Sequence, residues 1–210
     1  MLLYEYFRSS AAYRVRIALN LKGLAYDHRS IHLRKGEQRA ADYLGVNPQG
    51  LVPTLVIGNV RLTQSLAIME YLEERHPLPP LLPEGAEDRA WVRAIALAIA
   101  CDIHPINNTR VLQYLQRELQ VDDGRRDNWY RHWIREGFEA LEPMVRPGPY
   151  AFGSAVTLAD ICLVPQVFNA HRYQSLDLAP YPTIVRIYRT CLELPSFAAA
   201  HPDRQPDRES

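Results

Sequence analysis

Two neighbouring serines near the N-terminus are the first residues that could carry chemistry. Ser9 and Ser10 follow a short apolar stretch and precede a run with helical spacing, so they stand at the expected start of a helix. A helix N-terminus presents unpaired N–H groups and the positive end of the macrodipole, and it therefore favours negative charge. A serine at this place can cap the helix or face an anion. The residue types alone leave both functions open.

Two other short motifs combine polar groups with a defined backbone position. Pro53 follows Val52 at the head of an expected strand, where a proline cannot donate to the ladder and belongs at an edge or a turn. Gln64 and Ser65 precede another expected helix. The sequence contains no metal-ligand spacing, nucleotide-binding loop or nucleophile-elbow motif. The enzyme classes that such motifs mark are therefore disfavoured.

The elements that must position these groups alternate between strand and helix. Aromatic and aliphatic runs predict strands, one-face apolar spacing predicts helices, and Gly58-Asn59 is typical of a two-residue hairpin turn. A strand–helix–strand unit with short joins implies a parallel pair with a right-handed crossover. In chain order we expect strand Leu2–Phe7, helix Ser10–Lys22, strand Ala25–Leu33, helix Glu37–Leu44, strand Leu51–Ile57, strand Val60–Leu62 and helix Leu66–Glu74.

A proline-rich segment divides the chain into two parts of different character. Pro77–Pro83 contains four prolines and reads as a linker. We expect an α/β domain over 1–76, a linker over 77–87 and an all-helical domain over 88–210. The expected helices of the second domain are Asp88–Ile103, Ile106–Leu119, Asn128–Val145, Thr157–Arg172 and Thr183–Leu194.

Local signals define several helix ends in the second domain. His104-Pro105 should kink or end a helix, because proline removes a helical hydrogen bond. Thr157 should cap the following helix while Asp160, at its third position, reaches back to the N–H of the cap, which is a structural role. The polar tail after Pro202 is expected to fray.

Composition excludes some partners and suggests a compartment. The 24 basic residues equal the 24 acidic ones, so nothing indicates a nucleic-acid or membrane partner, and anion recognition must come from local arginines. Arg14 and Arg16 lie within a helix, as a solvated face or as salt-bridge partners. Cys101, Cys162 and Cys191 lie far apart, which fits a reducing compartment, and we expect the first two to be buried fillers. Without a basic leader or a long apolar run, the expected location is the cytoplasm.

Several stretches resemble the zeta class of glutathione transferases, which includes the maleylacetoacetate and maleylpyruvate isomerases. In the first half they are Ser9–Leu19, the segment from Asn47-Pro48 to Val52-Pro53-Thr54-Leu55, and Gln64–Leu72. The second half agrees at Asp102–Asn108, Thr157–Asp160 and Leu163–Val167. The resemblance covers nearly the whole chain. It implies the glutathione transferase fold, with an α/β N-terminal thioredoxin-like domain and an all-α C-terminal domain.

The resemblance gives the serine stretch a catalytic function. It implies that Ser9 donates to the thiolate of glutathione, with Ser10 beside it in the site. Two positions depart from the family: Ala11 stands where the family usually has cysteine, which is the departure that matters, and Tyr13 stands where tryptophan is common. Because alanine cannot act as a nucleophile or base, thiol activation falls to the serines and the helix end.

Other glutathione contacts follow from the same resemblance. Val52 would pair through its backbone with the cysteinyl unit, before a cis Pro53. Gln64 and Ser65 would hold the γ-glutamyl carboxylate at a helix N-terminus. The remaining expected glutathione-binding residues are Gln38, His104 and Asn108, although Gln38 could instead be a solvated surface residue and His104 a structural residue at the kink.

The substrates of this class carry carboxylates, for which arginine is the suited partner. The resemblance places Arg8, Arg110 and Arg172 around them, although each could also be an ordinary surface arginine. It implies a homodimeric isomerase that converts maleylacetoacetate to fumarylacetoacetate with glutathione as cofactor, through reversible thiol addition and rotation about the former double bond. Maleylpyruvate isomerisation is the nearest alternative, followed by general conjugation or haloacid dehalogenation and by glutathione binding without catalysis.

Overall fold

The computed structural model describes residues 1–171 and 176–209. Contacts divide the chain into two compact units: unit 1 comprises Met1–Leu81 with Leu192–Ser210, and unit 2 comprises Leu82–Cys191. These units are defined by which residues contact one another, so the domain boundaries expected at residues 76 and 88 stay a prediction. Within the described ranges, no helix is long and apolar enough to cross a membrane.

Unit 1 is built on a four-stranded mixed sheet with the order β2-β1-β3-β4. β1 and β2 run parallel with Leu3 opposite His28, whereas β3 runs antiparallel to β1 with Leu55 opposite Leu3. The β3–β4 hairpin turns at Gly58-Asn59, as expected. The strands are β1 Leu2–Glu5, β2 Asp27–Ser30, β3 Thr54–Ile57 and β4 Val60–Thr63. The parallel pair expected from the strand–helix–strand pattern is confirmed.

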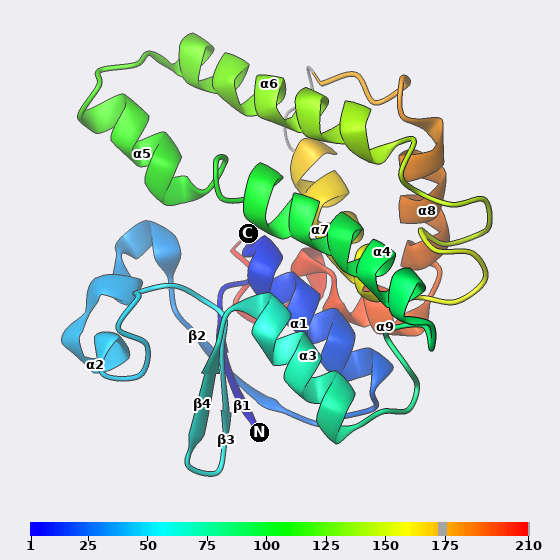
Figure 1. Cartoon of the computed structure of the whole chain (residues 1–210). Coiled ribbons are helices and arrows are strands. Elements are labelled where there is room, and N and C mark those ends of the chain that lie inside the picture. Colours follow the sequence, from blue (N-terminus) through cyan, green and yellow to red (C-terminus); the bar gives the residue numbers. More distant parts are fainter. Residues whose placement is uncertain (172–175, 210) are drawn as a thin grey trace. The chain divides into compact units, whose positions relative to one another are not determined.

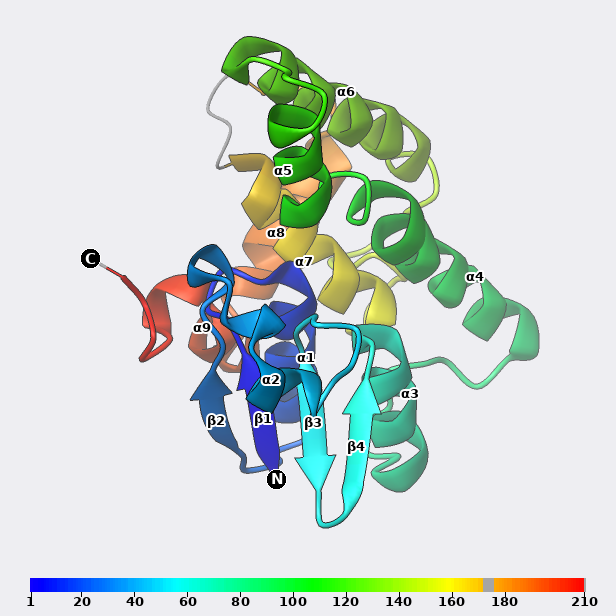
Figure 2. The same ribbon diagram turned by 90° about the vertical axis from the view of Figure 1, so that its left-hand side faces the viewer.

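Helices cover both faces of this sheet (Figure 1 and Figure 2). α1 (Ser10–Leu21) and α3 (Ser65–Arg75) lie on one face, and the short α2 (Ala41–Leu44) lies on the other. The single helix expected over Glu37–Leu44 is wrong, because Ala40 is extended between a 3₁₀ turn, Glu37–Arg39, and α2. So short a stretch gains little from helix propagation after its nucleation cost, and local packing decides its backbone.

The C-terminal segment folds onto unit 1. After α8, α9 (Pro195–Ala200) and a 3₁₀ turn, Pro202–Arg204, continue the chain, and Phe197 is fully buried. The side chain of Asn20 on α1 donates to the carbonyl of Ser196 at 3.0 Å. The expected fraying after Pro202 is therefore wrong over the described residues, since Gln205 is also buried. The residues after Pro202 are held instead by polar bonds, among them those of Asp207 with Phe7 and of Glu209 with His32.

Unit 2 is helical. The expected break before His104-Pro105 is confirmed, because the π-helical turn ends at Ile103. The helix expected from Ile106 begins only at Thr109, because Asn108 caps it and accepts a hydrogen bond from the N–H of Arg110 at 3.1 Å. The helices are α4 Ala86–Leu97, the π-helical turn Ala98–Ile103, α5 Thr109–Arg117, α6 Asp123–Leu141, α7 Leu158–His171 and α8 Pro182–Leu192.

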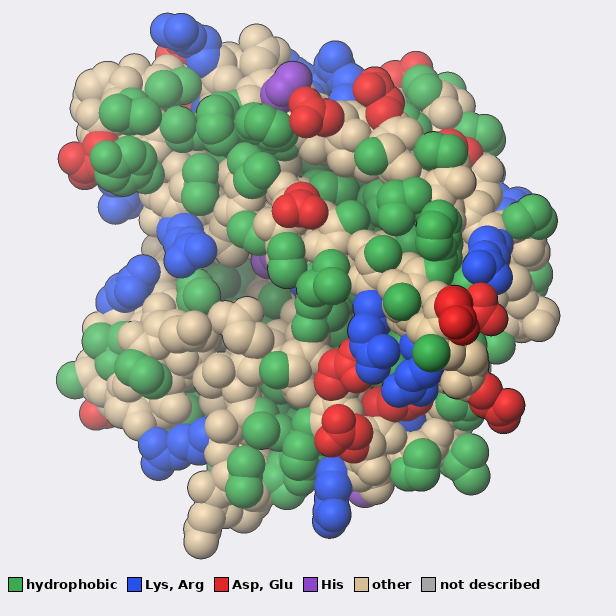
Figure 3. Space-filling view, in the orientation of Figure 1, with side chains coloured by type: hydrophobic (Ala, Val, Ile, Leu, Met, Phe, Trp, Pro, Cys, Tyr) green, Lys and Arg blue, Asp and Glu red, His purple; other side chains and the backbone are tan. Residues whose placement is uncertain are grey.

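The surface of unit 2 carries apolar side chains on one of its ends. Figure 3 shows them gathered over α5 and α6, where Tyr114 and Leu119 are more than half exposed. Cys101 is exposed as well, so its expected role as a buried filler is wrong, whereas Cys162 and Cys191 are buried. Cys101 lies on the π-helical turn, whose widened helix changes which residues face inward.

At the start of α7, Asp160 reaches back to the N–H of Thr157 as the sequence indicates, whereas the cap by the Thr157 hydroxyl stays a prediction. The carboxylate of Asp160 accepts from the N–H of Thr157 at 2.9 Å and from the N–H of Ala151 at 2.7 Å, and it also bonds the Thr157 hydroxyl. Burial raises the pKa of Asp160 to about 6, although these donors oppose the shift. The group ties the loop after α6 to α7.

Replacing Asp160 by alanine tests this connection. Asp160→Ala leaves two buried N–H groups without a partner, and we expect a loss of about 3 kcal/mol in the free energy of unfolding, measured with urea. Because the folded-state pKa is raised, this carboxyl stabilises the fold below pH 4 and loses that contribution as the pH rises through about 6. The loss should therefore be about 1 kcal/mol smaller at pH 8 than at pH 5.

The control is Asp177→Ala, which removes an exposed carboxylate that also accepts a main-chain N–H, from Ala179. It should change the free energy of unfolding by less than about 0.5 kcal/mol. Equal losses in the two variants would contradict the structural role of Asp160.

Candidate active site

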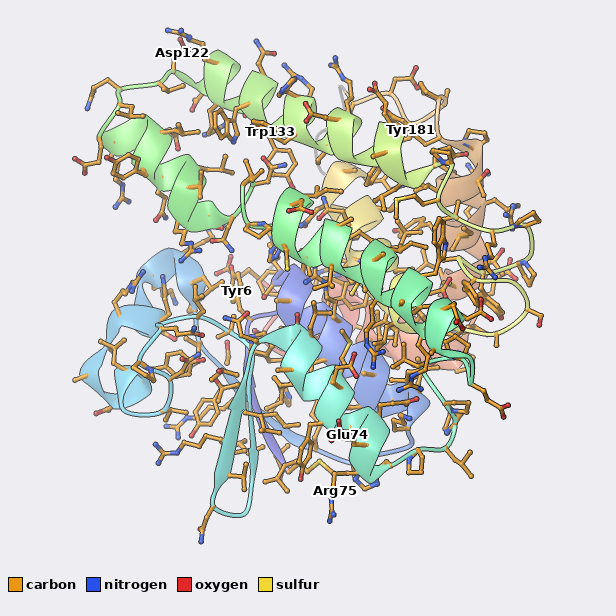
Figure 4. The ribbon with its side chains drawn as sticks, viewed as in Figure 1. Tyr6, Glu74, Arg75, Asp122, Trp133 and Tyr181 are labelled. Atoms are coloured by element: carbon orange, nitrogen blue, oxygen red, sulfur yellow. The ribbon has the colours of Figure 1, made fainter. Side chains whose placement is uncertain are left out.

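The first candidate group is the N-terminus of α1. Ser9 is its N-cap, and its Oγ accepts from the N–H of Ala12 at 3.2 Å. Tyr6, labelled in Figure 4, follows β1 where the chain turns towards α1, and its carbonyl accepts from the N–H of Ser9 at 2.8 Å. A capping serine uses only lone pairs, so its hydroxyl hydrogen stays available to an anion. Capping and anion binding are therefore compatible in one half-buried side chain.

The next two residues complete this helix end. Ser10 is buried and is the first residue of α1, whereas Ala11 is half-buried and offers no polar side-chain atom. The first turn of α1 therefore offers the two serine hydroxyls, together with the positive end of the helix dipole, to an anionic ligand.

The second group surrounds the peptide bond between Val52 and Pro53, which is cis. The preceding carbonyl, of Leu51, accepts from the Tyr43 hydroxyl at 2.6 Å and from the Asn47 amide at 2.7 Å. Among the described residues, Val52 takes part in none of the main-chain hydrogen bonds of turns, loops and caps. A main chain that takes part in none of these bonds can pair with an extended peptide ligand.

The third group is the N-terminus of α3. Gln64 has φ of 67°, a conformation that residues other than glycine seldom adopt, and its amide donates to Gln49 Oε1 at 3.0 Å. Ser65 is buried at the first position of α3, and its Oγ accepts from Nη1 of Arg14 at 3.3 Å. A guanidinium from α1 therefore stands at the N-terminus of α3, where helix dipole and side chain both favour an anion.

Gln38 belongs to the 3₁₀ turn Glu37–Arg39, which lies against Gly50 in the loop before the cis proline. Its side chain is half-buried, and its Oε1 is buried without a hydrogen-bond partner in the described chain. A Cβ at Gly50 would lie 2.9 Å from the carbonyl oxygen of Gln38, so only glycine permits this approach. A buried acceptor without a partner suits a ligand that donates to it.

The remaining expected residues lie on other segments. Arg8 is half-buried with its guanidinium 5.1 Å from the ring centre of Phe7. In unit 2, half-buried His104 follows the π-helical turn as its C-cap, and Asn108 and exposed Arg110 stand at the start of α5. Arg172 lies outside the described residues.

Two arginines of α1 are buried and bonded to other segments of unit 1, which the sequence did not lead us to expect of both. A solvated face is the wrong interpretation of Arg14 and Arg16, which are 1% and 0% exposed. The salt-bridge interpretation is confirmed for Arg16, which pairs with Glu5 and donates to the carbonyls of Phe7 (3.1 Å) and Ala200 (2.9 Å). Residues two apart point about 200° from each other on a helix, so α1 is buried on opposite sides. The apolar run from Val15 to Leu19 around Arg16 is the signal that could have indicated this.

The comparisons with known proteins agree with this geometry. Residues 8–75 match the family of the glutathione S-transferase N-terminal domain. A probable maleylacetoacetate isomerase of Vibrio cholerae is 52% identical over 211 residues, covering 99% of this chain and 98% of that protein.

Two solved structures are similar over their whole length. One is a holo maleylpyruvate isomerase described as a bacterial zeta-class glutathione S-transferase, with a TM-score of 0.97, 46% identity and full coverage of both chains. The other is a maleylacetoacetate isomerase from Methylobacterium extorquens with bound malonate and glutathione, with a TM-score of 0.96, 40% identity and the same coverage.

The mixed sheet, its covering helices and the helical unit 2 thus form the glutathione S-transferase fold, with a thioredoxin-like N-terminal part, as expected. Within that class, the chain belongs to the zeta-class family of maleylacetoacetate and maleylpyruvate isomerases.

The buried pair of Arg16 and Glu5 generates a prediction about stability. Arg16→Met leaves a buried carboxylate without its partner, and we expect a loss of about 3–5 kcal/mol in the free energy of unfolding, measured with urea. Burial raises the pKa of Glu5, so ionisation of this group opposes folding. The loss should be larger at pH 8 than at pH 5, where the unpaired carboxyl can take up a proton.

Arg208→Met is the control, because Arg208 is exposed and pairs with Asp203 only at 3.8 Å. Its effect should stay within about 0.5 kcal/mol at both pH values. A loss from Arg16→Met that is the same at pH 5 and pH 8 would show that Glu5 does not depend on Arg16.

Proposed function

We propose that the protein catalyses the glutathione-dependent cis–trans isomerisation of maleylacetoacetate to fumarylacetoacetate. The observation that carries the proposal is the N-terminus of α1, where Ser9 caps the helix and keeps a hydroxyl hydrogen to donate. The identity of 52% with a probable maleylacetoacetate isomerase supports the choice of reaction. Glutathione, when bound, supplies a thiol for reversible addition to the cis double bond.

The residues of unit 1 fit this cofactor. Ser9, with Ser10 beside it, donates to the thiolate, and the helix end adds its dipole. Val52, which precedes cis Pro53, offers main-chain groups to the cysteinyl unit. Gln64 and Ser65 bind the γ-glutamyl carboxylate. The positive charge of Arg14 and the main-chain N–H groups at the start of α3 suit this anion.

Residues outside these three groups complete the proposed site. Gln38, His104 and Asn108 contribute further glutathione contacts, and the buried Oε1 of Gln38 supports its part. Arg8, Arg110 and Arg172 bind the carboxylates of the substrate and stabilise negative charge that develops on it. The malonate bound to the Methylobacterium relative supports a dicarboxylate substrate.

Maleylpyruvate is the second candidate substrate. The similarity to a holo maleylpyruvate isomerase, with a TM-score of 0.97, favours it specifically. Rates measured side by side on the two cis acids with glutathione would distinguish them. Conjugation of other electrophiles without isomerisation would favour a general transferase instead, and glutathione binding without any turnover would favour a binding protein.

We also propose a homodimer in the cytoplasm, with domains at 1–76 and 88–210 joined by the linker 77–87. Membership of the zeta class supports the dimer, and three free cysteines suit a reducing compartment. Sedimentation at micromolar concentration that gives the mass of one chain would overturn the dimer.

The central test of the function is Ser9→Ala. Removing the hydroxyl takes away one preorganised donor, so kcat/KM for the cis acid should fall by about 100-fold or more, measured from the absorbance change on isomerisation. Ser9→Thr keeps a capping hydroxyl and should retain most of the activity. If wild type and Ser9→Ala convert the acid at the same rate, Ser9 does not activate the thiol.

A double-mutant cycle tests the start of α3. Arg14→Met and Ser65→Ala each remove one side of the contact between Nη1 and Oγ, and each should weaken glutathione binding, measured by titration calorimetry. Because the two groups serve one carboxylate, we expect a coupling of about 0.5 kcal/mol or more in the binding free energy. Additive effects would contradict a shared anion site, and Arg75→Met, an exposed arginine at the other end of α3, is the control.

A further inference from the structure

Phe7 connects β1 to the turn that carries Ser9, and the rest of unit 1 holds it at both of its main-chain polar groups. Its N–H donates to Oδ2 of Asp207 at 2.9 Å. Its carbonyl accepts from Nη2 of Arg16 at 3.1 Å, and Nε of the same guanidinium donates to the carbonyl of Ala200 at 2.9 Å. Both restraints on Phe7 therefore lead to the C-terminal segment, directly or through one side chain.

The C-terminal segment is itself fixed to unit 1. Figure 2 shows α9 and the chain after it alongside β2 and α1. The hydroxyl of Ser30, the last residue of β2, donates to the same Oδ2 of Asp207 at 3.0 Å. Further along, Glu209 pairs with His32 and with Arg34. Asp207 and its neighbour Glu209 are thus bonded to several residues of unit 1, which fix the position of Asp207.

The turn needs such a restraint because the sheet does not supply it. β1 ends at Glu5, so Phe7 lies outside the strand ladder, and α1 begins only at Ser10. A donor that stabilises a thiolate must be held to within a fraction of an ångström of its productive position. The hydrogen bond to Asp207 restrains Phe7, which lies two residues before Ser9, the proposed donor to the thiolate.

The bonding of Asp207 also argues against a purely stabilising role. Its other oxygen, Oδ1, is buried and accepts no hydrogen bond within the described part of the chain. A buried acceptor without a partner is unfavourable for stability. A negative charge close to a thiolate would moreover oppose its formation, so direct electrostatics cannot be the benefit.

We propose that Asp207 is a positioning residue for Ser9, and that the C-terminal segment is thereby a functional part of the active site. The inference rests on the proposed thiol-activating function of Ser9. Asp207 acts as a hydrogen-bond acceptor that fixes the N–H of Phe7, and through it the turn from Tyr6 to Ser9.

The test compares three variants in the full chain. Asp207→Ala removes both the charge and the acceptor, whereas Asp207→Asn removes the charge and keeps an acceptor for Phe7. Asp203→Ala is the control, because Asp203 is exposed in the same segment and pairs with Arg208. The readouts are the pH titration of bound glutathione, followed by the ultraviolet absorption of its thiolate, hydrogen exchange at the amide of Phe7, and kcat and KM for the cis acid.

We expect Asp207→Ala to raise the apparent pKa of the bound thiol by about one unit. At pH values below that pKa, the rate of isomerisation should fall about tenfold. Exchange at Phe7 should quicken, while KM for the acid and the melting temperature change little. Asp207→Asn should titrate like wild type or slightly lower, and Asp203→Ala should match wild type.

Two results would overturn the inference. The first is an unchanged pKa of the bound thiol in Asp207→Ala. The second is an equal rise of that pKa in Asp207→Ala and Asp207→Asn, because the effect would then come from the lost charge and not from the lost hydrogen-bond acceptor. Both outcomes leave the proposed function intact if wild type forms the thiolate and isomerises the acid. If wild type forms no thiolate with glutathione, the proposed function fails and the positioning role fails with it.

Discussion

The buried guanidinium of Arg16 holds together the segments from which the candidate site is assembled. One planar group pairs with Glu5 on β1, donates to the carbonyl of Phe7 and donates to the carbonyl of Ala200. The rigid fork of arginine can satisfy three acceptors in one plane, which a lysine ammonium on a flexible stem does less well. The strand, the serine turn and the C-terminal segment therefore share one point of attachment at this buried guanidinium.

The burial of α1 on opposite sides explains how a second arginine reaches another part of the site. Arg14 points away from Arg16 and contacts Ser65 at the start of α3. The two helix N-termini that can attract anions are thus connected by a side chain of the first helix. Because the formal net charge of the chain is zero, this local arrangement of helix ends and buried arginine must supply the attraction.

The sequence predicts what depends on neighbouring residues and fails where distant contacts decide. The capping serine, the strand–helix–strand unit, the hairpin and the bond from Thr157 back to Asp160 all rest on signals within a few residues, and the structure contains each of them. The resemblance also gave the cis bond before Pro53. The C-terminal partners of Arg16 and Phe7 lie 184 and 200 residues away, so no local pattern could indicate that the tail is ordered. The burial of Arg16 did have a local signal, the apolar run around it, although its partners had none.

The alanine after the two serines fits this division between local and distant contributions. A cysteine, usual in the family at the position of Ala11, would add a polarisable group to the turn, yet neither the cap of α1 nor the bonds to Phe7 involve that side chain. The groups that can stabilise an anion here are a hydroxyl and main-chain N–H donors, and their positions depend on the turn and on what holds it. The geometry of the turn consequently decides where these donors lie, and the bonds from Arg16 and Asp207 to Phe7 are contacts through which more distant segments can influence it.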